Sequence, residues 1–376
     1  MRTIEIRGTE HIRAALAGGR GAMVAVNHPA HGDPFVIFEA MSRMQVACCY
    51  LAAWQVLRGW WGLKGWAFQR LGAFSVDREG TDMRSFRAAV EVLATSGRSL
   101  VIFPEGEVYH LNDSITPLRE GAAMIAVTAA RRRRRSGGPA LHIVPCALKY
   151  FYLQDPTPQL QDVMSRLERR LYWRPRVGRP LAERIYRYAE AVLGLKEIEY
   201  LQSAGTGPLP DRIQRLSEHV LSELEKRRLD RVSREPVPVR VNRIRARIMK
   251  ELAGDDQPEP APEALEALDR DLGDLHLVTQ LFSYPGDYVA GQPSLERVTE
   301  TLDKFEEDAL GAVDAGARAP RRAIVSFGPS IDVTEHIGGE KGPARPAAGP
   351  LTAILQQRLQ EQLDCMSAGA AAPRND

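Results

Sequence analysis

The sequence of 376 residues contains little cysteine and almost no net charge. Its four cysteines are too few for a disulfide framework, and two of them, Cys48 and Cys49, are adjacent in an apolar run, which is typical of a reduced, intracellular protein. Their spacing indicates no zinc site. A net charge of +2 gives no global electrostatic reason to bind nucleic acid, so we expect no nucleic-acid partner.

Long hydrophobic runs are also missing. No uninterrupted apolar stretch reaches the roughly 20 residues that span a bilayer, and the N-terminus lacks an apolar signal core. The hydrophobic content of 44% and charged content of 26% are typical of globular domains. We therefore expect a soluble or peripheral protein, which has to approach any lipid substrate from the side of the membrane.

One short stretch concentrates polar groups. The apolar run 22–26 predicts a buried strand and is followed directly by Asn27-His28-Pro29-Ala30-His31-Gly32-Asp33-Pro34. The prolines and the glycine favour a tight turn that folds the carboxylate of Asp33 back onto the imidazole of His28. A base oriented by a carboxylate is suited to removing a proton from a hydroxyl group.

Further apolar runs alternate with helical patterns through the first 152 residues. Strands are expected at 45–51, 72–78, 99–103 and 141–147, and polar motifs follow several of them. This alternation predicts an α/β fold with a mainly parallel sheet, flanked by helices and with its site along one edge.

The character of the sequence changes after residue 152. Residues 153–320 contain six helical patterns and no evident internal repeat, and a strand at 322–327 and a helix at 351–363 follow. We expect a discontinuous core of residues 1–152 and 321–365, a helical insertion at 153–320 and a disordered tail at 366–376. A separate C-terminal domain is the alternative.

Four sequence blocks resemble those of the glycerolipid acyltransferases, the family that includes 1-acylglycerol-3-phosphate acyltransferase. In order, they are Asn27-His28-x4-Asp33, Gly72-x4-Asp77-Arg78, Phe103-Pro104-Glu105-Gly106 and the strand Ile143-Val144-Pro145. The first is similar to the catalytic H-x4-D motif of the family. The resemblance implies a glycerol-3-phosphate acyltransferase-like fold and O-acyltransferase activity, with no cofactor besides the acyl-CoA or acyl carrier protein that donates the acyl group.

The resemblance also implies roles for individual residues. His28 is expected to be the general base and Asp33 the group that orients it. Arg78 is expected to face an anionic group of the lysophospholipid acceptor, with Asp77 beside it. The other expected substrate-binding residues are Asn27, Phe103, Pro104, Glu105, Gly106 and Pro145. Glu105 has a second interpretation, as a structural residue that accepts hydrogen bonds from buried amides.

The third block departs from the family pattern. The family usually continues F-P-E-G with Thr and Arg, but Glu107 and Val108 follow here. An acid thus replaces a positive charge suited to phosphate, which favours a zwitterionic or uncharged acceptor. It also leaves open a degenerate, non-catalytic scaffold that acts through its helical region.

Four of the five tryptophans lie between residues 54 and 66, among Arg and Lys residues. Trp54, Trp60, Trp61 and Trp66 indicate either a core helix or a surface that contacts lipid headgroups at the inner face of a membrane. A metal-dependent hydrolase built on His28, His31 and Asp33 is a third alternative. We favour the acyltransferase, without a metal, because four blocks occur in order.

Overall fold

The computed structural model describes residues 3–17, 21–53, 73–76, 83–252, 261–291, 293–312, 315–337 and 345–371. They form two compact units, which we call the sheet unit (residues 1–155 and 319–376) and the helical unit (residues 156–318). The predicted residues Asp77 and Arg78, and Trp54, Trp60, Trp61 and Trp66, lie outside the described residues.

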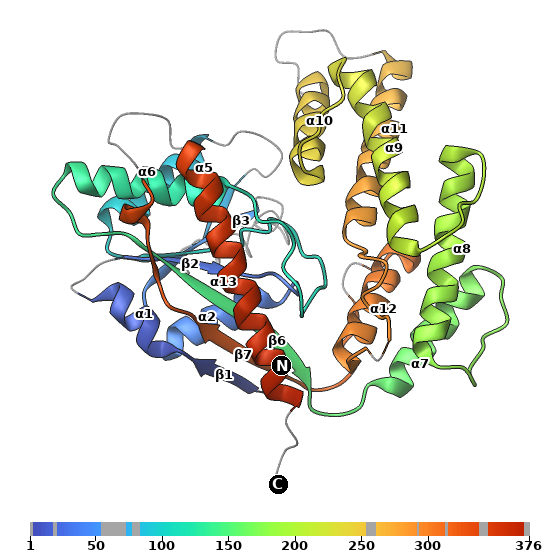
Figure 1. The fold of residues 1–376 in the computed structure, drawn as a ribbon, viewed down its shortest axis with the longest axis horizontal. Helices are drawn as coiled ribbons and strands as arrows, with labels where there is room; N and C mark the ends of the chain where they lie inside the picture. The colour runs from blue at the N-terminus through green and yellow to red at the C-terminus, as the bar shows by residue number, and fades with distance from the viewer. Residues whose placement is uncertain are drawn as a thin grey trace. The chain divides into compact units, whose positions relative to one another are not determined.

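The sheet unit is built on an eight-stranded sheet, seven strands of which form one path in the order β1-β7-β6-β2-β5-β3-β4 (Figure 1). The strands are β1 Thr3–Arg7, β2 Met23–Val26, β3 Cys48–Ala53, β4 Ala73–Val76, β5 Ser99–Ile102, β6 His142–Tyr152, β7 Arg321–Phe327 and β8 Ile331–Asp332. The β2, β3, β4 and β5 pairings are parallel, whereas β6 runs antiparallel to β7 and β8. The predicted mainly parallel sheet is confirmed.

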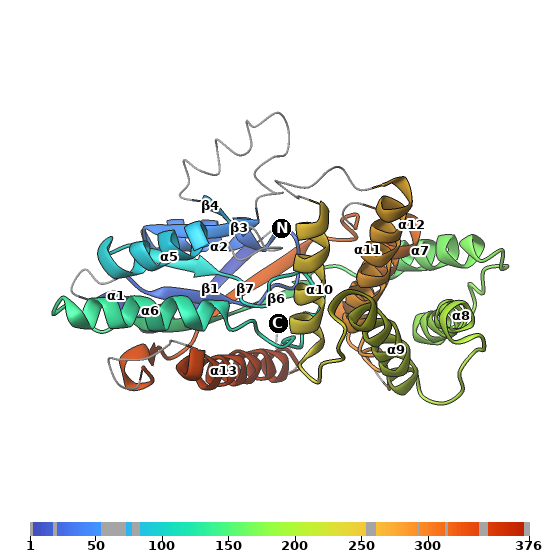
Figure 2. The same cartoon turned by 90° about the horizontal axis from the view of Figure 1, so that it is seen from above.

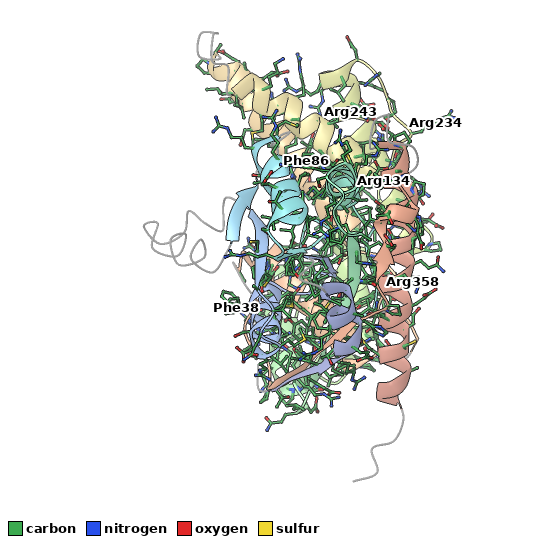
Figure 3. The ribbon with its side chains drawn as sticks, turned by 90° about the vertical axis from the view of Figure 1, so that its left-hand side faces the viewer. Phe38, Phe86, Arg134, Arg234, Arg243 and Arg358 are labelled. Atoms are coloured by element: carbon green, nitrogen blue, oxygen red, sulfur yellow. The ribbon has the colours of Figure 1, made fainter. Side chains whose placement is uncertain are left out.

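Alternate residues of β2 serve opposite faces of the sheet. Met23 and Ala25 pack in one core, and Val24 and Val26 pack in the other. Helices α5 (Met83–Thr95), α6 (Gly121–Arg135) and α13 (Arg345–Ala371) cover the first face, and α1 (Thr9–Leu16) and α2 (Asp33–Arg43) cover the second. Figure 2 shows α13 beside α6. Figure 3 labels one aromatic side chain packed against each core, Phe86 on the first face and Phe38 on the second. Both faces of β2 are therefore buried.

Helix α13 carries leucines at every fourth position on its buried side. Leu351, Leu355, Leu359 and Leu363 are at most 1% exposed, and burying each contributes about 1.5–3 kcal/mol. Met366 extends this row into a smaller core with Phe151 and Ile324. The helix consequently continues to Ala371, whereas the sequence predicted a disordered tail from residue 366.

Strand β7 lies inside the sheet, between β1 and β6. It pairs in parallel with β1 and antiparallel with β6, with Leu148 opposite Val325. The helical unit thus leaves the sheet unit after β6 and returns to it at β7, two strands that are hydrogen-bonded neighbours.

The helical unit contains six described helices. They are α7 Thr157–Arg170, α8 Leu181–Leu201, α9 Leu209–Leu229, α10 Val237–Leu252, α11 Pro262–Phe282 and α12 Leu295–Leu310. Helices α8 to α11 share one apolar core, and α7, α8 and α12 share another.

The first three connections of this unit share one ion-pair design that the sequence analysis did not find. Near the end of one helix, a buried glutamate accepts a hydrogen bond from an arginine one turn into the next helix. The pairs are Glu168–Arg184 at 2.8 Å, Glu197–Arg212 at 2.6 Å and Glu225–Arg240 at 2.8 Å. The same glutamates accept the backbone N–H of Arg176, Gly205 and Ser233, eight residues further on.

These clamps reveal an internal repeat. The arginines lie at 184, 212 and 240, thus 28 residues apart, and each follows a proline by four residues. The Arg212 guanidinium holds the pKa of Glu197 below its ordinary value. Each clamp orders a connection by satisfying a buried charge with charge-assisted hydrogen bonds. Within the connection itself, the glutamate bonds only a backbone N–H and no side chain.

Candidate active site

The candidate site begins where β2 ends at Val26. Residues 30–33 form a turn in which the Asp33 N–H donates to the Ala30 carbonyl at 3.1 Å. Asp33 then opens α2, and Pro34 occupies the first turn, where its missing N–H costs no helical hydrogen bond. The turn therefore returns the Asp33 side chain toward the end of the strand.

His28 and Asp33 form a buried pair, as the predicted turn requires. His28 Nδ1 lies 2.8 Å from Asp33 Oδ2, and the two residues are 6% and 0% exposed. The carboxylate can only accept, so the imidazole carries its proton on Nδ1 and presents Nε2 as a proton acceptor. The ring of Phe103 stacks on the imidazole with centroids 4.3 Å apart. The pair has the geometry of an oriented general base.

Tyr150 is a member of this site that the sequence analysis missed. Its hydroxyl, carried by β6, donates to Asp33 Oδ1 at 2.5 Å, while Oδ2 also accepts the Ala30 N–H at 2.9 Å. Burial raises the pKa of Tyr150, and the Asp33 charge adds to this effect, so the phenol stays a donor. Both carboxylate oxygens are thereby held, which leaves Asp33 one orientation toward His28.

Replacing Tyr150 with phenylalanine tests this arrangement. We expect turnover in the proposed reaction to fall about tenfold, because a hydrogen bond to a charged group contributes about 1.5 kcal/mol. The KM for the acyl donor is expected to stay unchanged, since the Tyr150 hydroxyl binds Asp33 and acts on His28 only through it. Steady-state kinetics with Tyr152→Phe as the matched control check this, and an equal loss in both variants would contradict it.

Glu105 lies in the turn after β5 and joins that turn to the end of β2. Its Oε1 accepts the backbone N–H of His28 at 2.8 Å, and its Oε2 accepts both the backbone N–H of Thr116 at 3.1 Å and the Thr116 hydroxyl. Burial raises the pKa of Glu105 above its ordinary value. These contacts are those of the structural interpretation, in which Glu105 accepts hydrogen bonds from buried amides and positions the backbone of His28.

Gly106 and Arg119 lie in direct contact beside this turn. Gly106 has a φ of 82°, and a Cβ at this position would lie 2.4 Å from Arg119 Nε. The Arg119 guanidinium lies 3.7 Å from Glu107, the acid that departs from the family pattern. The positive φ therefore favours glycine here, and a side chain would also displace the end of the Arg119 side chain.

The other predicted residues that the structure describes are Asn27, Phe103, Pro104 and Pro145. Asn27 is fully buried, and its side-chain amide binds both the N–H and the carbonyl of Leu148, extending the pairing of β2 and β6. Pro145 lies opposite Ala25 in the same pairing, and its carbonyl accepts the Gly328 N–H. Phe103 and Pro104 follow β5 beside Glu105. These positions place the first, third and fourth blocks on adjacent strands.

Comparison with known proteins agrees with this arrangement. Residues 3–149 match the acyltransferase family model. This segment is thus similar to the acyltransferase family. A stretch of 68 residues is 40% identical to 1-acyl-sn-glycerol-3-phosphate acyltransferase from Streptococcus pneumoniae. That stretch is 18% of this chain and covers only 24% of the relative's length.

The acyltransferase segment ends at β6, so the match leaves out the helical unit and β7. None of the helices in the described ranges combines the length and apolar character needed to cross a membrane.

Proposed function

We propose that the sheet unit transfers a fatty acyl group from a thioester to a hydroxyl of a lysophospholipid or related glycerolipid. His28 Nε2 takes the proton of the acceptor hydroxyl, and the oxygen attacks the thioester carbonyl carbon. The C–S bond then breaks, and the leaving thiolate takes the proton from His28. The products are an ester and a free thiol, and the enzyme ends in its starting state.

The observation that carries this proposal is the buried His28–Asp33 pair. Nδ1 is committed to the carboxylate, and Nε2 has no hydrogen-bond partner within the described part of the chain. Asp33 stabilises the imidazolium that forms when Nε2 takes a proton, as in other base–carboxylate pairs. Asp33 already accepts hydrogen bonds from three groups, an arrangement better suited to orienting a base than to ligating a metal.

The charges of Glu107 and Arg119 limit which headgroup the acceptor can carry. The similar protein is named for 1-acyl-sn-glycerol-3-phosphate, and a phosphate monoester needs uncompensated positive charge. Here the Glu107 carboxylate lies beside the Arg119 guanidinium and offsets its charge. We infer an acceptor with a zwitterionic or uncharged headgroup, with Arg78 as its anion-binding residue and Asp77 beside it. Acyl-CoA or acyl carrier protein is the inferred donor.

We further infer that the enzyme works as a peripheral protein at the inner face of a membrane, in phospholipid biosynthesis. A lysolipid acceptor is embedded in the bilayer, so the enzyme has to meet it at the headgroup level. Trp54, Trp60, Trp61 and Trp66 are the residues assigned to this contact from the sequence.

The decisive assay incubates the full chain with labelled long-chain acyl-CoA and, in separate reactions, lysophosphatidate, lysophosphatidylcholine and monoacylglycerol. We expect a labelled diacyl product and free thiol in equal amounts, with lysophosphatidate the poorest of the three acceptors. Thiol release without any acylated product would replace acyl transfer by thioester hydrolysis. A preference for lysophosphatidate would keep the reaction and overturn the acceptor class.

A further inference from the structure

The connection between α7 and α8 is chemically unlike its two repeat equivalents. We call residues 169–180, with the sequence Arg-Arg-Leu-Tyr-Trp-Arg-Pro-Arg-Val-Gly-Arg-Pro, the basic loop (Figure 1). It carries five arginines and no acid. All five arginines are exposed. The side chains of Arg169, Arg174 and Arg176 make no ion pair with the described part of the chain. Arg179 lies 3.9 Å from Glu183 on α8, and the loop has no acid of its own to offset its other arginines.

The other two connections show that the fold does not need this charge. Counted in the same way from the residue after the clamping glutamate, residues 198–208 carry one acid and no basic residue, and residues 226–236 carry five basic residues and two acids. In the basic loop the clamp uses Glu168, Arg184 and only the backbone of Arg176. The clamp therefore uses none of the arginine side chains of the loop.

Tyr172 points to the same conclusion. Its side chain is 98% exposed, and its backbone has a φ of 59°, where the equivalent residues are Gln202 and Asp230. A tyrosine gains nothing from burial here and is a poor choice for a left-handed conformation, which favours Gly, Asn or Asp. Val177 is 57% exposed on the same loop. Two apolar side chains are thus presented to solvent among arginines.

Trp173 attaches the basic loop to helix α8. Its ring is half-buried and lies 4.1 Å from the Arg187 guanidinium on α8, a cation–π contact. Its backbone N–H donates to the Glu168 carbonyl at 2.9 Å. The loop is therefore held in one shape, with its arginines, Tyr172 and Val177 outside.

We propose that the basic loop docks the helical unit on an anionic lipid bilayer. Arginines meet the negative headgroups, and tyrosine is favoured at the headgroup level because it combines an apolar ring with a polar tip. The excess of positive charge matches an anionic surface, and the exposed Tyr172 and Val177 supply the apolar contact that a purely electrostatic partner would not need. This surface lies outside the acyltransferase segment and does not depend on the proposed reaction.

The test is sedimentation of the full chain with phosphatidylcholine vesicles, with and without phosphatidylglycerol, in the absence of acyl donor. We expect Arg174→Gln/Arg176→Gln to weaken partition onto the anionic vesicles about 30-fold, since each arginine at such a surface contributes roughly a factor of five. The control is Arg231→Gln/Arg234→Gln, which removes the same charge from the equivalent α9–α10 connection. Arg234 is exposed there and labelled in Figure 3. The control should bind as the native chain does.

Tyr172→Gln provides a second, charge-independent variant. It installs the residue type of position 202, so thermal unfolding should be unchanged while partition onto anionic vesicles falls several-fold. Equal binding by the native chain and the arginine variant, or equal losses in variant and control, would overturn the proposal. Binding of the native chain to a duplex oligonucleotide but not to vesicles, lost in Arg174→Gln/Arg176→Gln, would replace the lipid by nucleic acid.

Discussion

Replacing His28 with glutamine is expected to lower acyl transfer about a thousandfold while the fold persists. A positioned general base contributes roughly 10²–10⁴-fold to a rate, and glutamine cannot take a proton at this position. Its side-chain amide can still donate to Asp33, so the turn that joins β2 to α2 should survive. Initial rates with the acceptor that gives product, together with circular dichroism and thermal unfolding, measure the two effects separately.

The matched control is His11→Gln, a histidine of α1 that lies outside the site. It should retain native activity. Asp33→Asn provides an internal check, because residues that act as one unit lose activity non-additively. The double variant with His28→Gln should be scarcely slower than His28→Gln alone. Full activity in His28→Gln, or a double variant whose losses simply multiply, would show that His28 and Asp33 do not act as a base and its orienting group.

Replacing Glu105 with alanine is expected to cost roughly 4–6 kcal/mol of folding free energy, the largest stability effect we predict. The change leaves three buried donors without their acceptor, namely the N–H of His28 and the N–H and hydroxyl of Thr116. Each unsatisfied buried donor costs about 1–3 kcal/mol, part of which water entering the space recovers. Urea denaturation followed by tryptophan fluorescence gives the difference.

Glu107→Ala is the control for this change, because Glu107 is the same residue type two positions away. Its ion pair with Arg119 is partly exposed, so its loss should cost less than about 1 kcal/mol. Similar losses for the two variants would show that the hydrogen bonds of Glu105 do not hold the two strand ends together.

The pH dependence of Glu105 has a defined sign. Burial raises the pKa of Glu105 in the folded protein, so the folded state binds this proton more tightly than the unfolded chain. Relative to Glu105→Gln, the native chain should therefore gain stability as the pH falls through the folded-state pKa. The gain should stop below the pKa of an unfolded glutamate, about 4.3. A stability difference that is constant with pH would contradict the raised pKa.

Local sequence was enough to place several features. The His28–Asp33 contact joins residues five apart, and the intervening Pro29 and Gly32 restrict the turn between them. The helices of the helical unit follow from their apolar periodicity, and the six helical patterns of residues 153–320 correspond to the six described helices. The family resemblance was likewise visible in four short blocks of the sequence, and the family model matches residues 3–149, which contain them.

The repeat of the helical unit shows why another feature was missed. Its repeating positions are a glutamate, a proline and an arginine spread over some 16 residues, within helices rich in these residue types. Glutamate and arginine are common on any solvated helix face, so their spacing carries no signal until the pairs are seen to be buried. Burial identifies Glu168 and Arg184 as partners, and their repeat equivalents then follow.

The sequence alone therefore determined the His28–Asp33 contact, because a short turn brings these two residues together. Only the tertiary structure decided what holds that pair in place. Tyr150 and Glu105 reach it from β6 and β5, which are 117 and 77 residues distant from their partners along the chain. Those contacts depend on which strands become neighbours of β2, and that order is set by packing over the whole sheet, including β7 from the far end of the chain.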